Sequence, residues 1–212
     1  MDEMEQDLDG GCGIERWQVK TGGDPAAANI SAAAIATSIE ALTSLPAPPT
    51  LPQAERISPT ELTTWQLADV DLLRFKKEND GDYHLVLSDG TRTMIAEIAD
   101  PACVSAASPL LAGISAARAQ FNAKYSNIPT LSFADSGETA TLSGVGFFDF
   151  KHAQNGVAPN AIELHPVTAI CFGRGCAPAA LPPAARSGGC ATAGDAPLWL
   201  ALLALRRRRA TA

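Results

Sequence analysis

The stretch Gly144–Val167 reads GVGFFDFKHAQNGVAPNAIELHPV and joins two apolar runs through a loop rich in Gly, Pro and Asn. Alternation of apolar and polar residues with a period of two is typical of a strand, and Gly, Pro and Asn favour turns. The pattern predicts strands over residues 139–150 and 161–172. Because Pro166 cannot donate to a ladder, His165 is expected at a sheet edge or a bulge.

Upstream of this stretch, the same alternation predicts three more strands. They cover residues 64–75, 82–87 and 92–98. The last two flank Ser88–Thr91, a composition typical of a hairpin turn. After Ser108-Pro109, apolar residues at helical spacing predict a helix that runs to about Tyr125.

A second helix is predicted near the N-terminus. Asp24-Pro25 has the form of an N-cap followed by proline at the first helical position. Three apolar residues follow at helical spacing: Ile35, Ile39 and Leu42. We expect an Ala-rich amphipathic helix that ends near Leu45, preceded by a short extended segment at Trp17–Lys20.

The predicted element order is one helix followed by β-β-β-α-β-β. This order is typical of a mainly β, OB-like five-stranded barrel. Staphylococcal-nuclease-type domains resemble it as well. An open, five-stranded α+β sheet with one helix-covered face is the alternative.

The chain of 212 residues is long enough for one core, and its composition divides it into four parts. These are a disordered segment at 1–13, a single globular domain at 14–173, an Ala/Pro/Gly-rich linker at 174–195, and a short hydrophobic anchor with an Arg cluster at 196–212. No signal peptide is visible, because the first segment has neither a basic nor an apolar region. The apolar run of the last part is also too short to span a bilayer, which takes about 20 residues.

The formal net charge of -7 conceals an asymmetry. Residues 174–212 contain six Arg and one Asp, which leaves residues 1–173 with a formal charge of about −12. So acidic a body repels a phosphate backbone. Nucleic acid is therefore disfavoured as a partner unless divalent ions bridge the two.

The chain has five cysteines and no CxxC pair, so zinc-finger spacing is absent. In an exported protein Cys190 has a separate role, and the other four form two disulfides. Three pairings of those four are open.

The C-terminal part contains Gly189-Cys190, an apolar run at Leu198–Leu205, and the cluster Arg206–Arg209. This three-part pattern resembles the MYXO-CTERM sorting signal of myxobacterial surface proteins. The resemblance implies export, processing near Cys190 and anchoring at the cell surface. It also implies that the C-terminal tail contacts the membrane or the sorting machinery.

The body resembles a family of exported bacterial proteins that has an OB-like element order and no established activity. Three phrases carry this resemblance: Gly81–Leu87, Gly146–Phe150 with His152, and Ile162–Val167. The resemblance supports the fold and adds nothing to the chemistry.

A first candidate site lies in the predicted hairpin. Alternation places Asp82 and His84 on the face opposite Tyr83. If Asp89-Gly90 are the central turn residues, Asp82 faces Glu97 directly and His84 lies diagonal to it, at about 7–8 Å. We interpret Asp82, His84 and Glu97 as a candidate metal or acid/base cluster.

A second candidate site lies in the opening stretch. It contains Asp149, His152, Asn160, Glu163 and His165. Imidazole together with carboxylate suits zinc or another divalent ion. The alternative for both sites is structural, because Asp and Asn cap loops and a histidine beside a glutamate on an outer strand face is often a solvated pair.

Two functions follow from these patterns. The first is a non-enzymatic, surface-anchored binding module for an unknown ligand. The second is a divalent-metal-dependent hydrolase, nuclease-like, with His84, Glu97, His152 and His165 as candidate catalytic residues and Asp149, His152, Glu163 and His165 as candidate metal ligands. The sequence has no GxSxG motif, no P-loop and no GxGxxG motif after a strand, so no cofactor other than a divalent ion is expected.

Overall fold

The computed structural model describes residues 11–13, 15–151 and 153–178. The chain divides into the compact units Met1–Pro182 and Pro183–Ala212, and the second unit lies outside the described residues. The predictions for His152, for Cys190, for the N-terminal segment up to residue 10 and for the C-terminal sorting signal also lie outside them.

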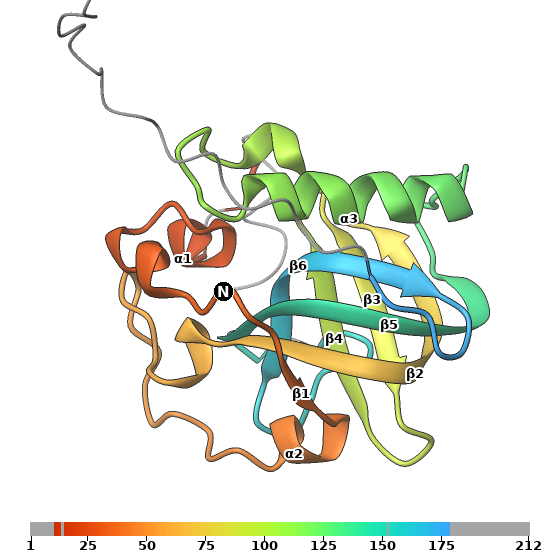
Figure 1. Ribbon diagram of the computed structural model, residues 1–212, viewed down its shortest axis with the longest axis horizontal. Helices are drawn as coiled ribbons and strands as arrows, with labels where there is room; N and C mark the ends of the chain where they lie inside the picture. The colour runs from red at the N-terminus through yellow and green to blue at the C-terminus, as the bar shows by residue number, and fades with distance from the viewer. Residues whose placement is uncertain (1–10, 14, 152, 179–212) are drawn as a thin grey trace, which may run out of the picture. The chain divides into compact units, whose positions relative to one another are not determined.

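Six strands form one mixed sheet (Figure 1). They are β1 (Ile35–Thr37), β2 (Thr64–Lys77), β3 (Tyr83–Ser88), β4 (Thr93–Ile98), β5 (Ala134–Phe148) and β6 (Ile162–Phe172). Their order is β1-β2-β3-β4-β6-β5, and β2 also pairs with β5, so the five longer strands pair in a ring. The β1–β2 and β4–β6 pairs are parallel and the others are antiparallel. The prediction of a mainly β chain is confirmed, and each of the five predicted strands is present.

In the described residues, three α-helices and three 3₁₀ turns accompany the strands. They are α1 (Trp17–Thr21), α2 (Ile39–Thr43), α3 (Leu111–Lys124), η2 (Pro25–Asn29), η3 (Thr60–Leu62) and η4 (Pro101–Cys103). The predicted second helix is thus confirmed as α3. In the part of the chain that the structure describes, no helix has both the length and the apolar character needed to cross a membrane.

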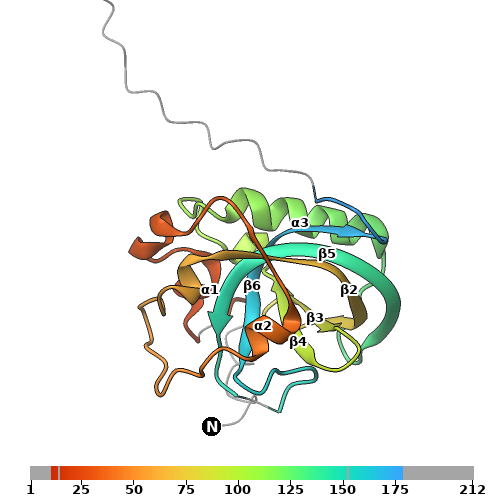
Figure 2. The same ribbon diagram turned by 60° about the horizontal axis from the view of Figure 1, so that its bottom comes forward.

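The main apolar core lies on one face of the paired strands. Figures 1 and 2 show α3 packed over the strands, with α2 at the far end of the ring. The core contains Leu42 of α2, Leu85 of β3 and Phe121 of α3, each with almost no exposed surface. Burial of large apolar side chains of this kind stabilises a fold by about 1.5–3 kcal/mol each. The two helices therefore close the core at opposite ends.

The predicted N-terminal amphipathic helix is wrong beyond its first turn. Asp24 is the expected N-cap, and its side chain accepts a hydrogen bond from the backbone N–H of Ala26. The chain then leaves the helix, because Ile35 pairs with Trp65 as part of β1 and stays half-exposed. Backbone pairing with β2 competes successfully with the weak helical pattern here, and only α2 remains helical.

The segment predicted to be extended at Trp17–Lys20 is helical instead. Arg16 and Gly22, both left-handed with φ of 49° and 71°, flank α1. The guanidinium of Arg56 donates to the carbonyl of Val19 at 2.7 Å. Tertiary contacts rather than local propensity therefore determine this helix.

A buried ion pair fixes the segment that contains α1. Arg16 donates to both carboxylate oxygens of Glu61, at 2.8 and 2.9 Å, and neither side chain is exposed. Arg16 also donates to the carbonyl of Phe148, and the Phe148 N–H donates to Glu61 at 2.9 Å. The pair therefore joins the N-terminal segment, η3 and the end of β5.

Breaking this ion pair is expected to cost far more stability than breaking an exposed one. Arg16→Met leaves the Glu61 carboxylate buried without its partner, which costs about 3–5 kcal/mol of unfolding free energy. Arg92→Met removes the exposed Arg92–Glu40 pair and should cost less than about 1 kcal/mol. Urea denaturation of both variants measures the difference, and equal losses would contradict the assignment.

Two disulfides link the four described cysteines: Cys12–Cys103 and Cys171–Cys176. The structure thus selects one of the three open pairings. The first bond closes a loop with a sequence separation of 91, and the second closes one of 5. A cross-link stabilises a fold mainly by restricting the unfolded chain, and the effect grows with loop length.

The two disulfides should therefore contribute unequally to stability. From loop length, removal of Cys12–Cys103 by a double Cys→Ser change is expected to cost about 4.6 kcal/mol, and the same change at Cys171–Cys176 about 2 kcal/mol. Thermal unfolding of the two double variants measures this order. The reverse order would show that loop closure does not determine their contributions.

Candidate functional site

The β3–β4 hairpin brings His84 directly opposite Glu97. The expected pairing of Asp82 with Glu97 is wrong, because the register of the hairpin differs by two residues. The reason is the turn: Asp89 Oδ1 accepts hydrogen bonds from the N–H groups of Thr91 and Arg92, which produces a longer connection than a two-residue turn. His84 Nδ1 lies 3.2 Å from Glu97 Oε1 as a result.

The parallel β4–β6 pairing unites the two candidate sites. Ile95 pairs with Glu163 and Ala96 with Leu164, so Glu97 comes next to His165. His165 Nδ1 lies 3.1 Å from Glu97 Oε2 and 3.2 Å from Glu163 Oε1. We refer to Asp82, His84, Glu97, Glu163 and His165 as the acid–histidine cluster.

His165 lies in a bulge, as Pro166 indicated. The β5–β6 register shifts on either side of Gly144, where Val167 and then Leu164 pair with β5. The irregularity presents His165 on the same face as Glu163, and the imidazole is buried. The prediction of an edge or bulge is therefore confirmed as a bulge.

Three polar atoms of the acid–histidine cluster are buried without a hydrogen-bond partner. They are Asp82 Oδ2, His84 Nδ1 and His165 Nε2. His165 Nε2 and Asp82 Oδ2 lie 3.4 Å apart, close enough for charge attraction but without hydrogen-bond geometry. Buried polar atoms are usually hydrogen-bonded, and each exception calls for an explanation.

The neighbouring carboxylates raise the pKa of both imidazoles. Burial alone would lower the pKa of His165, but Asp82, Glu163 and Glu97 raise it well above its usual value. In the same way burial opposes the shift at His84, whereas Glu97 raises its pKa. In both cases the attraction of nearby carboxylates outweighs the effect of burial on the pKa.

The pKa values of the neighbouring carboxyl groups are shifted in opposite directions. Burial would raise the pKa of Glu97, yet its contacts with His165 and His84 lower it well below the usual value. Burial and the nearby carboxylates of Asp149 and Glu97 raise the pKa of Glu163 to about 7. Asp80, beside the cluster, has its pKa raised to about 6 by burial and by the charges of Asp82 and Glu97.

Two residues of the predicted second site have other partners. Asp149 forms an ion pair of 2.9 Å with Lys20 of α1. The side-chain amide of Asn160 donates to the carbonyls of Leu42 and Leu45, so this residue caps the end of α2. Asn160 is therefore structural, as the capping alternative proposed.

Several groups that surround the acid–histidine cluster could not be identified from sequence patterns. Lys20 lies near Glu163 and Glu97, and these carboxylates together with Asp149 raise its pKa above the usual value although burial opposes the shift. Glu78 Oε1 lies 3.3 Å from His84 Nδ1. No periodic or motif signal connects α1 to strands so distant in the chain.

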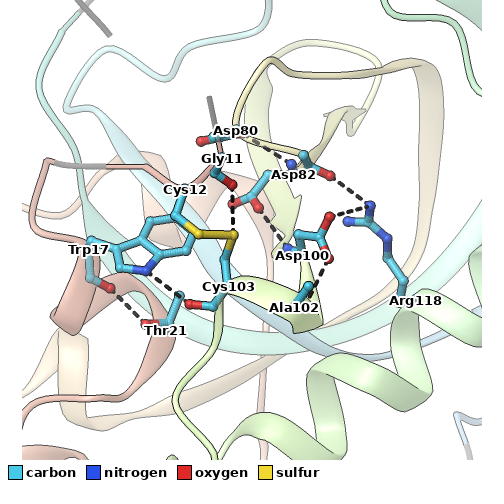
Figure 3. The surroundings of a disulfide bond; sticks show 11 residues. Gly11, Cys12, Trp17, Thr21, Asp80, Asp82, Asp100, Ala102, Cys103 and Arg118 are labelled. Carbon is cyan, nitrogen blue, oxygen red and sulfur yellow. Dashed lines mark hydrogen bonds and ion pairs between the residues drawn. A yellow bond between two sulfur atoms is a disulfide. The ribbon is translucent and has the colours of Figure 1, made fainter. Parts of the chain in front are cut away.

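The disulfide Cys12–Cys103 lies close to the cluster. Figure 3 shows it together with Asp80, Asp82 and Asp100. Asp82 Oδ1 accepts from the Asp100 N–H at 2.7 Å, which leaves Oδ2 as the unpartnered oxygen. The backbone thus holds Asp82 in a fixed orientation toward His165.

Three members of the cluster can hold a metal ion. Asp82, Glu97 and His165 each offer a ligand atom, and these atoms lie within 4.8 Å of one another. Glu163 and His84 stand beside them. Of the predicted metal ligands, His165 belongs to this group of three, whereas Asp149 forms an ion pair with Lys20.

Comparisons with known proteins bring no further information. No protein-family model, no curated protein and no solved structure matches this chain. The chemistry of the site therefore rests on the geometry described above.

Proposed function

We propose that this chain is an exported binding module whose globular domain holds a divalent cation between Asp82, Glu97 and His165. The observation that carries the proposal is the convergence of three buried ligand groups, two of which have an unpartnered atom: Asp82 Oδ2 and His165 Nε2. An ion between them would satisfy both atoms. Imidazole and carboxylate together favour zinc or manganese over calcium or magnesium.

Distances support a cation of this class. Zinc bonds to nitrogen and oxygen of about 2.0–2.2 Å put two ligand atoms at most about 4.4 Å apart. The ligand atoms of Asp82, Glu97 and His165 already lie within 4.8 Å of one another. A shift of about half an ångström would complete the coordination.

The balance of charged groups around the cluster also supports a bound cation. Six carboxyl groups belong to the acid–histidine cluster or border it: Glu78, Asp80, Asp82, Glu97, Asp149 and Glu163. They face the basic groups Lys20, His84 and His165, and Lys76 pairs with Glu78. A divalent cation reduces this excess of negative charge, and an acidic body attracts one from solution.

The ring of strands supports an OB-like barrel as the architecture. In that fold the outer face of the second and third strands, together with two flanking connections, binds ligands. Here β3 and β4 correspond to those strands, and the carbonyl of Asn155 in the β5–β6 connection accepts a hydrogen bond from His84 Nε2 at 2.9 Å. If the ring is an OB-like barrel, the acid–histidine cluster corresponds to its ligand face.

Export and surface anchoring remain part of the proposal. Two disulfides among the described cysteines favour an oxidising compartment. The Cys190 motif and the Arg cluster supply the sorting signal, with the membrane or its sorting machinery as partner. A surface polymer bridged by the cation fits an acidic body better than nucleic acid does.

The direct test is a titration of the metal-free full chain with Zn²⁺ and Mn²⁺ by calorimetry. One ion per chain is expected, with at least about 100-fold weaker binding in Glu97→Gln, because a ligand is lost. Glu138→Gln is the matched control, since Glu138 is exposed and pairs with Lys124 away from the cluster. Equal affinities in the two variants, or no binding by the wild-type chain, would reject the proposal.

A hydrolase is the second candidate, and one observation favours it. Glu163 Oε1 lies 3.2 Å from His165 Nδ1, and its carboxyl group would serve as the general base if an ion at the three ligands supplied an activated water. Asp82, Glu97 and His165 are all buried, however, so a substrate needs movement of the segments above them.

The hydrolase reading predicts turnover of bis-para-nitrophenyl phosphate by the Zn²⁺- or Mn²⁺-loaded chain. Glu163→Gln should lower the rate at least about 100-fold while the ion stays bound, because it removes the general base. Colorimetric release of nitrophenol measures this, with Glu138→Gln as control. A wild-type rate equal to that of the free ion would eliminate the enzyme and leave the binding module.

A further inference from the structure

A segment near the N-terminus of the described chain lies over the acid–histidine cluster. We call residues 11–13 and 15–21 the N-terminal cover. Lys20 of the cover interacts with Glu163 and Glu97, and the Arg16 guanidinium lies 4.6 Å from the centre of the Phe147 ring. The Phe147 ring also contacts the His165 ring edge-on, at 5.7 Å between ring centres. The cover therefore lies over the β6 side of the cluster.

The same segment also reaches the β3 side. Gly13 lies so close to Trp17 and Asp80 that an added Cβ would meet both, with 3.2 Å to Asp80 Oδ2. The Asp82 N–H donates to Asp80 Oδ1, so the cover touches the loop that positions Asp82. The three ligand residues have little exposed surface, and Glu97 has the most, at 8%.

The attachments of the cover differ along its length. Its C-terminal half is held by the Arg16–Glu61 and Lys20–Asp149 ion pairs. Its N-terminal end is held covalently by Cys12–Cys103, and Trp17 Nε1 donates to the Cys103 carbonyl at 3.1 Å. Figure 3 shows the disulfide and the Trp17 ring beside Asp80 and Asp82.

We propose that the Cys12–Cys103 disulfide locks the N-terminal cover over the acid–histidine cluster and so controls how fast a divalent cation enters and leaves. This inference rests on the proposed cation site and adds its regulation. The ligands come from β3, β4 and β6, which the disulfide does not join. Loss of the bond is therefore expected to change the exchange rate far more than the affinity.

The chemistry of opening is thiol–disulfide exchange with a dithiol reductant. A thiolate of the dithiol attacks one sulfur of the pair, and the other leaves as a thiolate that takes up a proton. The second thiol of the reductant then resolves the mixed disulfide, which leaves two protein thiols and an oxidised reductant. Two electrons and two protons pass to the protein. Without the covalent bond the cover opens by local unfolding at a smaller free-energy cost.

The second disulfide offers a matched control. Cys171–Cys176 lies at the end of β6, where Phe172 pairs with Ala140 of β5, and it is not among the contacts of the cover. The full chain is prepared as wild type, as Cys12→Ser/Cys103→Ser, and as Cys171→Ser/Cys176→Ser. Each form is loaded with Zn²⁺ and mixed with excess chelator, and the release rate is followed.

Release from Cys12→Ser/Cys103→Ser should be at least tenfold faster than from wild type, whereas Cys171→Ser/Cys176→Ser should match wild type. Dithiothreitol should accelerate release from the second variant and leave the first unchanged. Equal Zn²⁺ release rates in all three forms would overturn the proposal. Equal acceleration by dithiothreitol in both variants would overturn it as well.

A second measurement separates the lock from the ion site itself. Deuterium exchange of the backbone N–H groups of α1 needs no ion, and it should be faster in Cys12→Ser/Cys103→Ser alone. If no form binds Zn²⁺ but exchange is selectively faster, the cation site is wrong and the clamped cover is right. If the backbone N–H groups of α1 exchange at equal rates in all forms, the disulfide does not hold the cover closed, whether or not an ion binds. Thermal unfolding curves confirm that each variant is folded.

Discussion

The ion pair between Arg16 and Glu61 is the interaction on which the arrangement of the site depends. Glu61 accepts from Arg16, from the Phe148 N–H and from the Ile57 N–H, so its charge is compensated although it is wholly buried. A buried carboxylate without such partners would be strongly destabilising. The pair thereby fixes α1 against the end of β5. Lys20 meets Asp149 as a consequence.

The strands use their two faces for different purposes. Tyr83, Leu85 and Leu87 of β3 point into the apolar core, while His84 points into the acid–histidine cluster. Both faces are buried, so the polar one requires internal partners. Carboxylates and imidazoles supply most of them, whereas Asp82 Oδ2 and His165 Nε2 lie 3.4 Å apart and have no hydrogen bond. These two atoms are the reason for proposing that the cluster takes up a cation.

Much of the fold could be predicted from alternation, because β2 to β6 and α3 have strong patterns of period two or of helical spacing. The region before β2 could not: Ile35 has a helical neighbour pattern, yet its backbone pairs with β2. The members of the cluster were also recognised as polar groups on outer strand faces. These residues come together through the parallel β4–β6 pairing, which is a long-range contact that no local sequence pattern predicts. The same holds for Lys20, which reaches the cluster only through tertiary contacts of α1.

The measurement that tests the central claim most directly is a crystal structure of the Zn²⁺-soaked protein with diffraction data collected at the zinc edge. The cation assignment predicts one anomalous peak between Asp82, Glu97 and His165, with bonds of about 2.0–2.2 Å. A cluster without a peak, in which Asp82 and His165 contact each other directly, would contradict it. The buried groups would then be a network of ion pairs and nothing more.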